Sequence, residues 1–128
     1  MTATRRLVST GSPFEKQAGY SRAVVQEPWC FVSGTTGYNY QTMEMPGDVE
    51  TQAANCLATI DAALAEAGFA RSDIIRAHYV VTDPADAESV FPILGEYFAG
   101  IRPAATMIVA SLVRPEMRIE IEVTALRR

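Results

Sequence analysis

Residues 102–125 read RPAATMIVASLVRPEMRIEIEVTA, and this stretch decides the fold. A polar break that contains proline, Arg114-Pro115-Glu116, divides it into two runs rich in β-branched residues, which predicts two consecutive strands. In the first run both alternating sets of side chains are apolar or small, so we expect this strand to be covered on both faces. In the second run Ile119, Ile121 and Val123 alternate with charged residues, which predicts one buried face and one charged face.

The charged row of the second run has two interpretations. It contains Arg118, Glu120 and Glu122, and such a row is most often a solvated outer face. If the neighbouring strand is covered on both faces, however, this row does not face open water. A carboxylate that is partly withdrawn from water has a shifted pKa and is a candidate for chemistry.

Length and composition indicate one domain that spans residues 1–128. A chain of this length buries roughly two-thirds of its unfolded surface and needs no disulfide or metal to fold. Hydrophobic residues make up 48% and charged residues 20%, which is ordinary for a globular protein. No apolar run follows the N-terminus and no stretch approaches membrane-spanning length, so we expect a cytoplasmic protein without membrane contact.

The charged and metal-binding residues argue against several classes of site. The net charge is −4 and the 11 basic residues form no run, which argues against binding to nucleic acid. Cys30 and Cys56 lie in apolar patterns and are expected in the core rather than in a disulfide. His78 is the only histidine, so no His/Cys zinc cluster can form, and no glycine-rich phosphate loop is present. We therefore expect neither a metal nor a cofactor.

The rest of the chain predicts strands separated by helices. Asp48 is a suitable N-cap for a helix that ends at Gly68. Asp83-Pro84 suits the start of a second helix, in which Pro92 either kinks the helix or marks its true first turn. The loop 35–47 is rich in Tyr and Met, so it either rims a pocket or subunit contact or folds over its own core. The other expected segments are strands at residues 6–9, 19–25, 29–34 and 73–82 and a polar segment at residues 14–18.

This order of elements predicts an α+β fold, with a mixed sheet and two helices packed on one of its faces. The other face would carry Met107 and Val109, and nothing remains in the chain to cover them. A second copy of the protein is the simplest cover, so we expect an oligomer that buries this face of the sheet.

The ordered set of motifs resembles the YjgF/Rid family over residues 6–127. The resemblance rests on the strand end Val32-Ser33-Gly34, the strand entry Arg102-Pro103-Ala104 and the terminal Ile119-Glu120-Ile121-Glu122, in addition to the order of elements. These proteins are the reactive enamine/imine deaminases, and some are called L-PSP endoribonucleases. The resemblance implies a chorismate-mutase-like fold and a homotrimer whose sheets line a central barrel. It also implies a small-molecule cleft at each subunit interface.

The resemblance further implies a set of site residues. Tyr20 and Ser33 match a pocket tyrosine and a strand-end serine, and Met107 falls where many members have cysteine. Glu120 matches the acidic residue that positions water, which makes it the implied catalytic residue. Ala105 occupies the position of the arginine that holds the substrate carboxylate. A methyl group cannot supply the bidentate contact of a guanidinium, so the common activity does not follow from the fold alone.

Two other arginines are candidates for the missing contact. Arg22 lies two residues from Tyr20 on the same face of its predicted strand. Arg102 lies at the mouth of the strand that carries Ala105. Both are also open to an ordinary role as surface or salt-bridge residues, and this alternative has more weight for Arg102 than for Arg22. His78 either reaches a channel between subunits or is satisfied by its neighbours.

Three functions follow from these residues. The first is a deaminase-like hydrolase that acts on a small imine or enamine, with Glu120 placing water in a pocket whose substrate has changed. The second is a non-catalytic trimer that binds a small metabolite at the same interface, which Ala105 favours. The third, an endoribonuclease, has less support because the sequence has no basic stripe.

Overall fold

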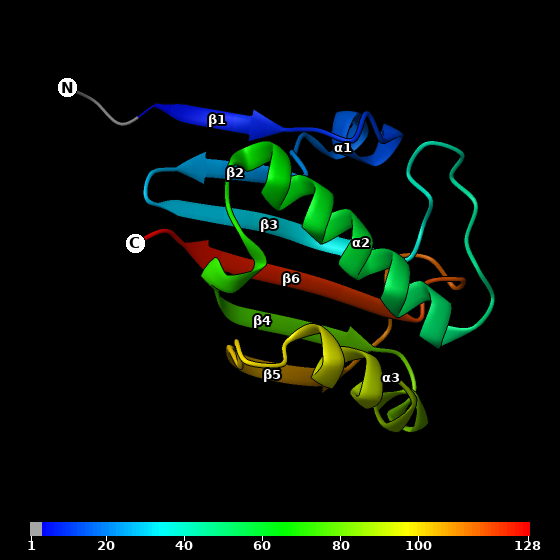
Figure 1. Ribbon diagram of the computed structural model, residues 1–128. Helices are drawn as coiled ribbons and strands as arrows, with labels where there is room; N and C mark the ends of the chain where they lie inside the picture. The colour runs from blue at the N-terminus through cyan, green and yellow to red at the C-terminus, as the bar shows by residue number, and fades with distance from the viewer. Residues whose placement is uncertain (1–3) are drawn as a thin grey trace.

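The computed structural model describes residues 4–128 and shows one mixed sheet with two long helices on one face (Figure 1). Residues 1–3 of the expected domain lie outside the described residues. The strand order across the sheet is β1-β2-β3-β6-β4-β5. The elements are β1 (Arg5–Val8), α1 (Pro13–Ala18), β2 (Ala23–Gln26), β3 (Trp29–Thr36), α2 (Val49–Ala67), η1 (Arg71–Asp73), β4 (Ile74–Val81), α3 (Pro84–Tyr97), β5 (Ala104–Val109) and β6 (Ile119–Leu126).

The two strands of the last quarter of the chain are consecutive in sequence but are not neighbours in the sheet. β6 lies between β3 and β4 and is antiparallel to both, whereas β5 pairs only with β4, in parallel, at the sheet edge. β5 ends at Val109, before the apolar run ends in the sequence. The chain therefore places its most regular alternating strand, β6, at the centre of the sheet.

The predicted helices form where their capping residues lie. The Asp48 side chain accepts a hydrogen bond from the Thr51 backbone N–H at the start of α2, and Gly68 ends that helix with φ 81°. Asp83 caps α3 in the same way, and Pro92 lies inside this helix rather than at its first turn. The polar segment at residues 14–18 belongs to the short helix α1, which the sequence analysis did not predict.

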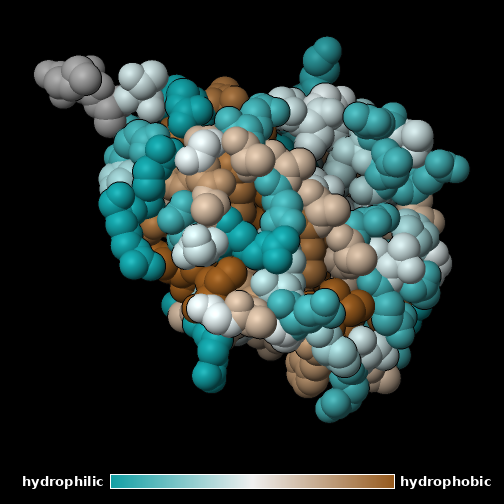
Figure 2. All heavy atoms as spheres, in the orientation of Figure 1, coloured by the Kyte–Doolittle hydropathy of each residue, from teal (hydrophilic) through white to brown (hydrophobic). Residues whose placement is uncertain are grey.

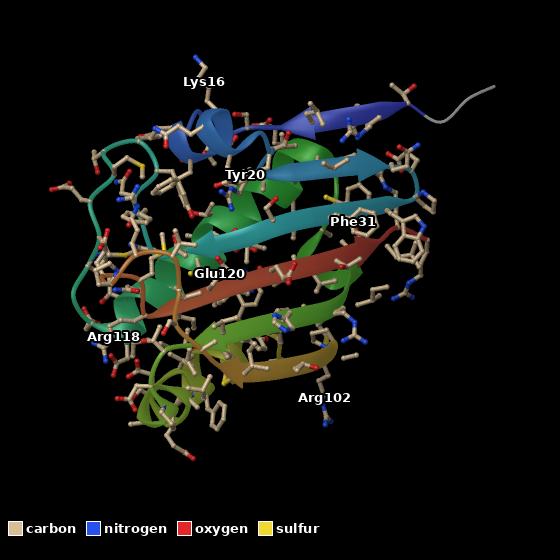
Figure 3. All side chains as sticks on the ribbon, turned by 180° about the vertical axis from the view of Figure 1, so that it is seen from behind. Lys16, Tyr20, Phe31, Arg102, Arg118 and Glu120 are labelled. Carbon is tan, nitrogen blue, oxygen red and sulfur yellow. The ribbon has the colours of Figure 1, made fainter. Side chains whose placement is uncertain are left out.

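The core lies between the sheet and α2 and α3. Ile119, Ile121 and Val123 of β6 are buried against it, as the alternation predicted. The opposite face of the sheet carries no helix within residues 4–128 (Figure 3). We call it the open face, and on it Trp29 and Phe31 stack with ring centroids 6.0 Å apart and both remain partly exposed.

The structure corrects the expected orientation of β5. Met107 is level with Tyr79, and Val109 is level with Val81, in the parallel pairing with β4. Tyr79 and Val81 belong to the core, so Met107 and Val109 point to the helix side and not to the open face. The alternation could not decide this because both sets of side chains in β5 are apolar or small; the register with β4 decides it.

Two further expectations can be compared with the structure. Cys30 and Cys56 are both buried free thiols, which confirms that they are core residues. None of the helices formed by residues 4–128 is long and apolar enough to cross a membrane.

Candidate functional site

Glu120 lies near the start of β6 and points from the open face toward β3 (Figure 3). Its side chain is half-buried and lies against Gly34. A Cβ atom at position 34 would lie 2.7 Å from the Glu120 Cδ and 2.8 Å from its Oε1. The glycine at the end of β3 therefore provides the space that the Glu120 carboxyl group occupies.

Burial and three neighbouring side chains act on the pKa of the Glu120 carboxyl group. Burial is the largest influence and raises the pKa of this carboxyl group, and the nearby Glu122 raises it further. The positive charge of Arg22 and the proximity of His78 act in the opposite direction but do not cancel the rise in pKa. A carboxylate with a raised pKa is a better proton acceptor near neutral pH than an ordinary surface carboxylate.

Arg22 holds the end of β3 beneath this carboxyl group. Its Nη1 donates hydrogen bonds to the Gly34 carbonyl oxygen at 2.8 Å and to the Thr35 Oγ1 at 3.0 Å. The register between β3 and β6 shifts at this point, so the strand end is irregular and its backbone carbonyls need partners. Arg22 is completely buried. It therefore acts on Glu120 through its charge and through the strand end, and it presents no surface on the open face.

Tyr20 and Ser33 lie at the same end of the sheet. Tyr20 is 38% exposed, and its ring centroid lies 5.7 Å from the Arg22 Cζ. Burial is the main cause of a raised pKa for the Tyr20 hydroxyl, so it is protonated at neutral pH. The Ser33 Oγ donates a hydrogen bond of 2.6 Å to the Ser21 carbonyl oxygen. The structure thus brings Tyr20, Arg22, Ser33 and Glu120 together.

The β5 residues of the expected site lie elsewhere. Ala105 and Met107 point to the helix side and line an apolar groove of about 490 Å³ between β5 and α3. Arg102 is at the rim of this groove, and its side chain points away from the sheet (Figure 3). Glu120 points to the opposite face of the sheet. Within one chain, the structure therefore does not bring Ala105, Met107 and Arg102 to the Glu120 carboxyl group.

The structure shows the contacts of His78 and of the loop 35–47, for each of which the sequence left two alternatives open. The His78 Nδ1 lies 3.6 Å from the Glu122 Oε1, and both side chains are partly exposed, so His78 belongs to the charged row of the open face. In the loop 35–47, the Tyr38 hydroxyl donates to the Glu116 carboxylate at 2.6 Å. Tyr40 of the same loop accepts a hydrogen bond from the Thr36 backbone N–H at 2.9 Å. The loop is therefore packed against the rest of the chain.

A family model described as Endoribonuclease L-PSP matches residues 10–127. The chain belongs to the YjgF/L-PSP family. A RutC family protein from Leuconostoc mesenteroides is 30% identical, over 97% of this chain and 99% of that protein. A crystal structure of a YjgF/YER057c/UK114 family member from Mycobacterium tuberculosis has a TM-score of 0.88 at 36% identity, and it covers 97% of this chain and 100% of that one.

The YjgF gene product of Escherichia coli is similar to this chain at 27% identity with a TM-score of 0.85, covering 96% of this chain and 99% of that one. These likenesses confirm the chorismate-mutase-like α+β fold that the motifs implied. Proteins with different names share this family, so membership fixes the architecture and leaves the reaction to be argued from the site.

Two side chains that contact Arg22 were not among the predicted site residues, and their loop setting had favoured exposure of the first. One is Glu15, whose Oε2 lies 3.9 Å from the Arg22 Nε and is buried with it. The other is Tyr40, whose ring centroid lies 4.8 Å from the Arg22 Cζ. Both come from segments without a regular period in the sequence, and α1 and the loop 35–47 approach Arg22 only in the folded chain.

Proposed function

We propose that this chain is a deaminase-like hydrolase that releases ammonia from a small imine or enamine in a pocket between subunits of a homotrimer. The observation that carries the proposal is the Glu120 carboxyl group: it is half-buried on the open face, is seated over Gly34, and has a raised pKa. This environment is typical of a general base rather than of a solvated surface charge.

The reaction that suits this carboxylate is hydrolysis of a C=N bond. The imine reacts in its N-protonated form: Glu120 accepts a proton from water as the water oxygen bonds to the iminium carbon, and the π electron pair moves to nitrogen, which gives a neutral carbinolamine. The carboxyl group then gives this proton to the amine nitrogen. As the C–N bond breaks, Glu120 takes the hydroxyl proton, the C=O bond forms, and ammonia and a carbonyl compound leave. Tyr20 and Ser33 lie at the same end of the sheet as Glu120, and in this proposal they orient the substrate.

A neighbouring subunit is part of the proposal because one chain presents only half of such a pocket. Glu120 and the groove beside Ala105 are on opposite faces of the sheet, so a single ligand cannot contact both within one chain. The stacked Trp29 and Phe31 on the open face support burial against another copy, because exposed aromatic pairs of this kind favour protein contacts. Homotrimer formation would place the Ala105 side of one subunit against the Glu120 side of the next.

The substrate we propose is one without a carboxylate at the Ala105 end. The groove there is lined mainly by apolar side chains, including Phe91, Leu94 and Met107. Arg22 is buried and Arg102 points away from the sheet, so neither is placed to replace the missing arginine. An imine with an apolar substituent fits this lining better than a 2-imino acid.

The test is an assay of the purified full chain on two freshly generated substrates, a 2-imino acid and an imine of similar size without a carboxylate. Release of ammonia and of the carbonyl product is followed together. We expect turnover of the second substrate, and a loss on the order of 10²-fold or more in Glu120→Gln, because a general base contributes roughly that much. Glu88→Gln, at an exposed carboxylate of α3, is the control. Unchanged turnover in Glu120→Gln would overturn the role of Glu120.

Ala105 also favours a second candidate function, in which the same pocket binds a metabolite without converting it. Tight binding of both imines with chemically unchanged ligand recovered would support this non-catalytic role. The endoribonuclease name that relatives carry has less support, because the chain has a net charge of −4 and acidic groups on its open face. Absence of RNA binding at low ionic strength would exclude the endoribonuclease function.

A further inference from the structure

Two of the few buried charged side chains lie next to the proposed site. Figure 2 shows hydrophilic residues spread over the helix side of the molecule, where charged groups keep contact with water. Within residues 4–128, Glu15, Arg22 and Asp86 are buried instead, at 6%, 0% and 5% exposure. Asp86 has a direct arginine partner at 2.8 Å. Glu15 and Arg22 are buried against each other at a longer distance, so this pair needs a different explanation.

The guanidinium of Arg22 lies between two carboxyl groups. Its Nη1 donates to the Gly34 carbonyl oxygen at 2.8 Å, at the strand end on which the Glu120 carboxyl group is seated. Its Nε lies 3.9 Å from the Glu15 Oε2, which is too long for a hydrogen bond. Glu15 therefore attracts this edge of the guanidinium by charge alone. The aromatic rings near the same guanidinium are those of Tyr20 and Tyr40.

Glu15 is held in place by hydrogen bonds to other residues. Its Oε1 accepts from the Ser9 Oγ at 2.7 Å, and its Oε2 accepts from both the backbone N–H and the hydroxyl of Thr10. Its backbone carbonyl oxygen accepts from the N–H groups of Gly19 and Tyr20, at 2.9 and 3.0 Å. The Glu15 carboxylate is therefore a fixed negative charge beside Arg22.

The Glu120 carboxyl group, in contrast, forms no ion pair among residues 4–128. Of the charged groups near it, Glu122 and His78 are 3.6 Å from each other, so Arg22 is the cation placed to pair with Glu120. Such an ion pair would favour the charged carboxylate and make it a weaker proton acceptor. The other groups beside Glu120 are uncharged: Thr36, Val80 and the Cys56 thiol, whose pKa is raised by burial.

We propose that Glu15 is a positioning residue that keeps Arg22 on its own side of Gly34 and so leaves the Glu120 carboxyl group free to accept a proton. Glu15 acts through Arg22 and does not touch the substrate. The inference rests on the proposed function, because Glu120 is the base of that reaction. It adds the residue that keeps this base from being neutralised by the buried cation beside it.

The experiment follows the carboxyl carbon of Glu120 by NMR against pH, in the full chain labelled with carbon-13 glutamate. The signal is identified by its absence in Glu120→Gln. Glu15→Gln keeps the size of the side chain and an accepting oxygen but removes the charge. We expect Glu120 to titrate at a lower pH in Glu15→Gln than in the parent, because the released guanidinium pairs with Glu120. Glu88→Gln, at an exposed carboxylate of α3, is the control and should leave this titration unchanged.

Removing both buried charges should reverse the direction of the shift. In the double variant Glu15→Gln/Arg22→Met no guanidinium remains to pair with Glu120, so Glu120 should titrate at the same pH as in the parent or at a higher one. The imine assay adds a second measurement. In Glu15→Gln the acidic limb of the pH–rate profile should move to lower pH, and the plateau should fall roughly 3- to 10-fold because a weaker base accepts the proton less readily.

Several results would overturn the proposal. They are an unchanged or higher titration pH in Glu15→Gln, an equal shift in Glu88→Gln, and a lowered titration pH in the double variant. Slower turnover in Glu15→Gln without a shift of the titration would show a purely structural role, which also contradicts the proposal. If the double variant does not fold, the single variant still decides. The titration needs no turnover, so an inactive parent with the expected shift would refute the deaminase reaction and leave the role of Glu15 intact.

Discussion

Gly34→Ala separates the position of the Glu120 carboxyl group from its chemistry. Gly34 is in β3 and does not have the left-handed backbone that requires glycine, so alanine adds only a methyl group. That methyl carbon would lie 2.7 Å from the Glu120 Cδ, which is 0.7 Å below the 3.4 Å at which ordinary contact begins. The carboxyl group is the far end of a flexible side chain, so it moves while the strand stays in place.

The expected size of the effect follows from this displacement. A misplacement of about 1 Å of a catalytic group costs on the order of 10²-fold in rate, so 0.7 Å should reduce turnover by roughly 10- to 100-fold. Overpacking costs about 1 kcal/mol at its low end, and replacing glycine recovers about 0.4–1 kcal/mol through the unfolded chain. The free energy of unfolding should therefore change little.

The assay compares imine turnover and urea unfolding for three variants. Gly47→Ala has no heavy atom within 4 Å of the added carbon, so neither quantity should change. Gly37→Ala would bring its methyl carbon to 2.6 Å from the Gln52 Cα, and we expect it to lose about 3 kcal/mol of stability. Full turnover in Gly34→Ala, with its fold intact, would refute the placement of the reaction over Gly34.

Three other changes test the electrostatics and the buried polar contacts. The pKa of Glu120 is raised in the folded state, so the free energy of unfolding falls as the pH rises from about 4.3, the ordinary carboxyl pKa, through the pKa of the folded protein. Above this pH range Glu120→Gln should therefore be more stable than the parent, and below it the two should be equally stable. Thermal unfolding midpoints against pH check this, with the exposed Glu88 of α3 changed to Gln (Glu88→Gln) as the control, and a difference independent of pH would contradict it. Gln52→Ala should lose about 3 kcal/mol in urea, since the completely buried Gln52 side chain makes three hydrogen bonds to backbone groups; a loss below 1 kcal/mol would count against this role. The Asp86–Arg118 pair, with contacts of 2.8 and 3.3 Å, should show a coupling energy of about 1–2 kcal/mol in a double-mutant cycle, and additive single variants would argue against it.

Regular elements were predicted from the sequence because their signals are local. The caps Asp48 and Asp83, the end at Gly68 and the alternation along β6 all act within a few residues, and all were confirmed. The short helix α1 was missed because a six-residue segment is too short to show a helical period. Its Ser12 cap and the closing Gly19 with φ 75° were the signals that could have indicated it.

The face to which β5 points could not be predicted, for a different reason. Ala105 and Met107 form one set of alternating side chains and Thr106 and Ile108 the other, and neither set is polar enough to face water. Only the pairing with β4 assigns Met107 to the helix side, and pairing between distant segments leaves no mark in the local sequence. The burial of Arg22 has the same origin, because the segments that cover it come from α1 and the loop 35–47.

Several features around Glu120 lower the stability of the fold, which argues that this region has a function. A half-buried carboxyl group with a raised pKa lowers stability at neutral pH, and Arg22 buries two donors that have no hydrogen-bond partner among residues 4–128. Gly34 adds the entropic cost of a glycine inside a strand. A chain selected only for folding would have no reason to combine these three at one strand end, and such local costs are typical of functional sites. These costs at the Glu120 end of the sheet therefore support our proposal of an active pocket, in which Ala105 in place of a cation would change the substrate rather than the reaction.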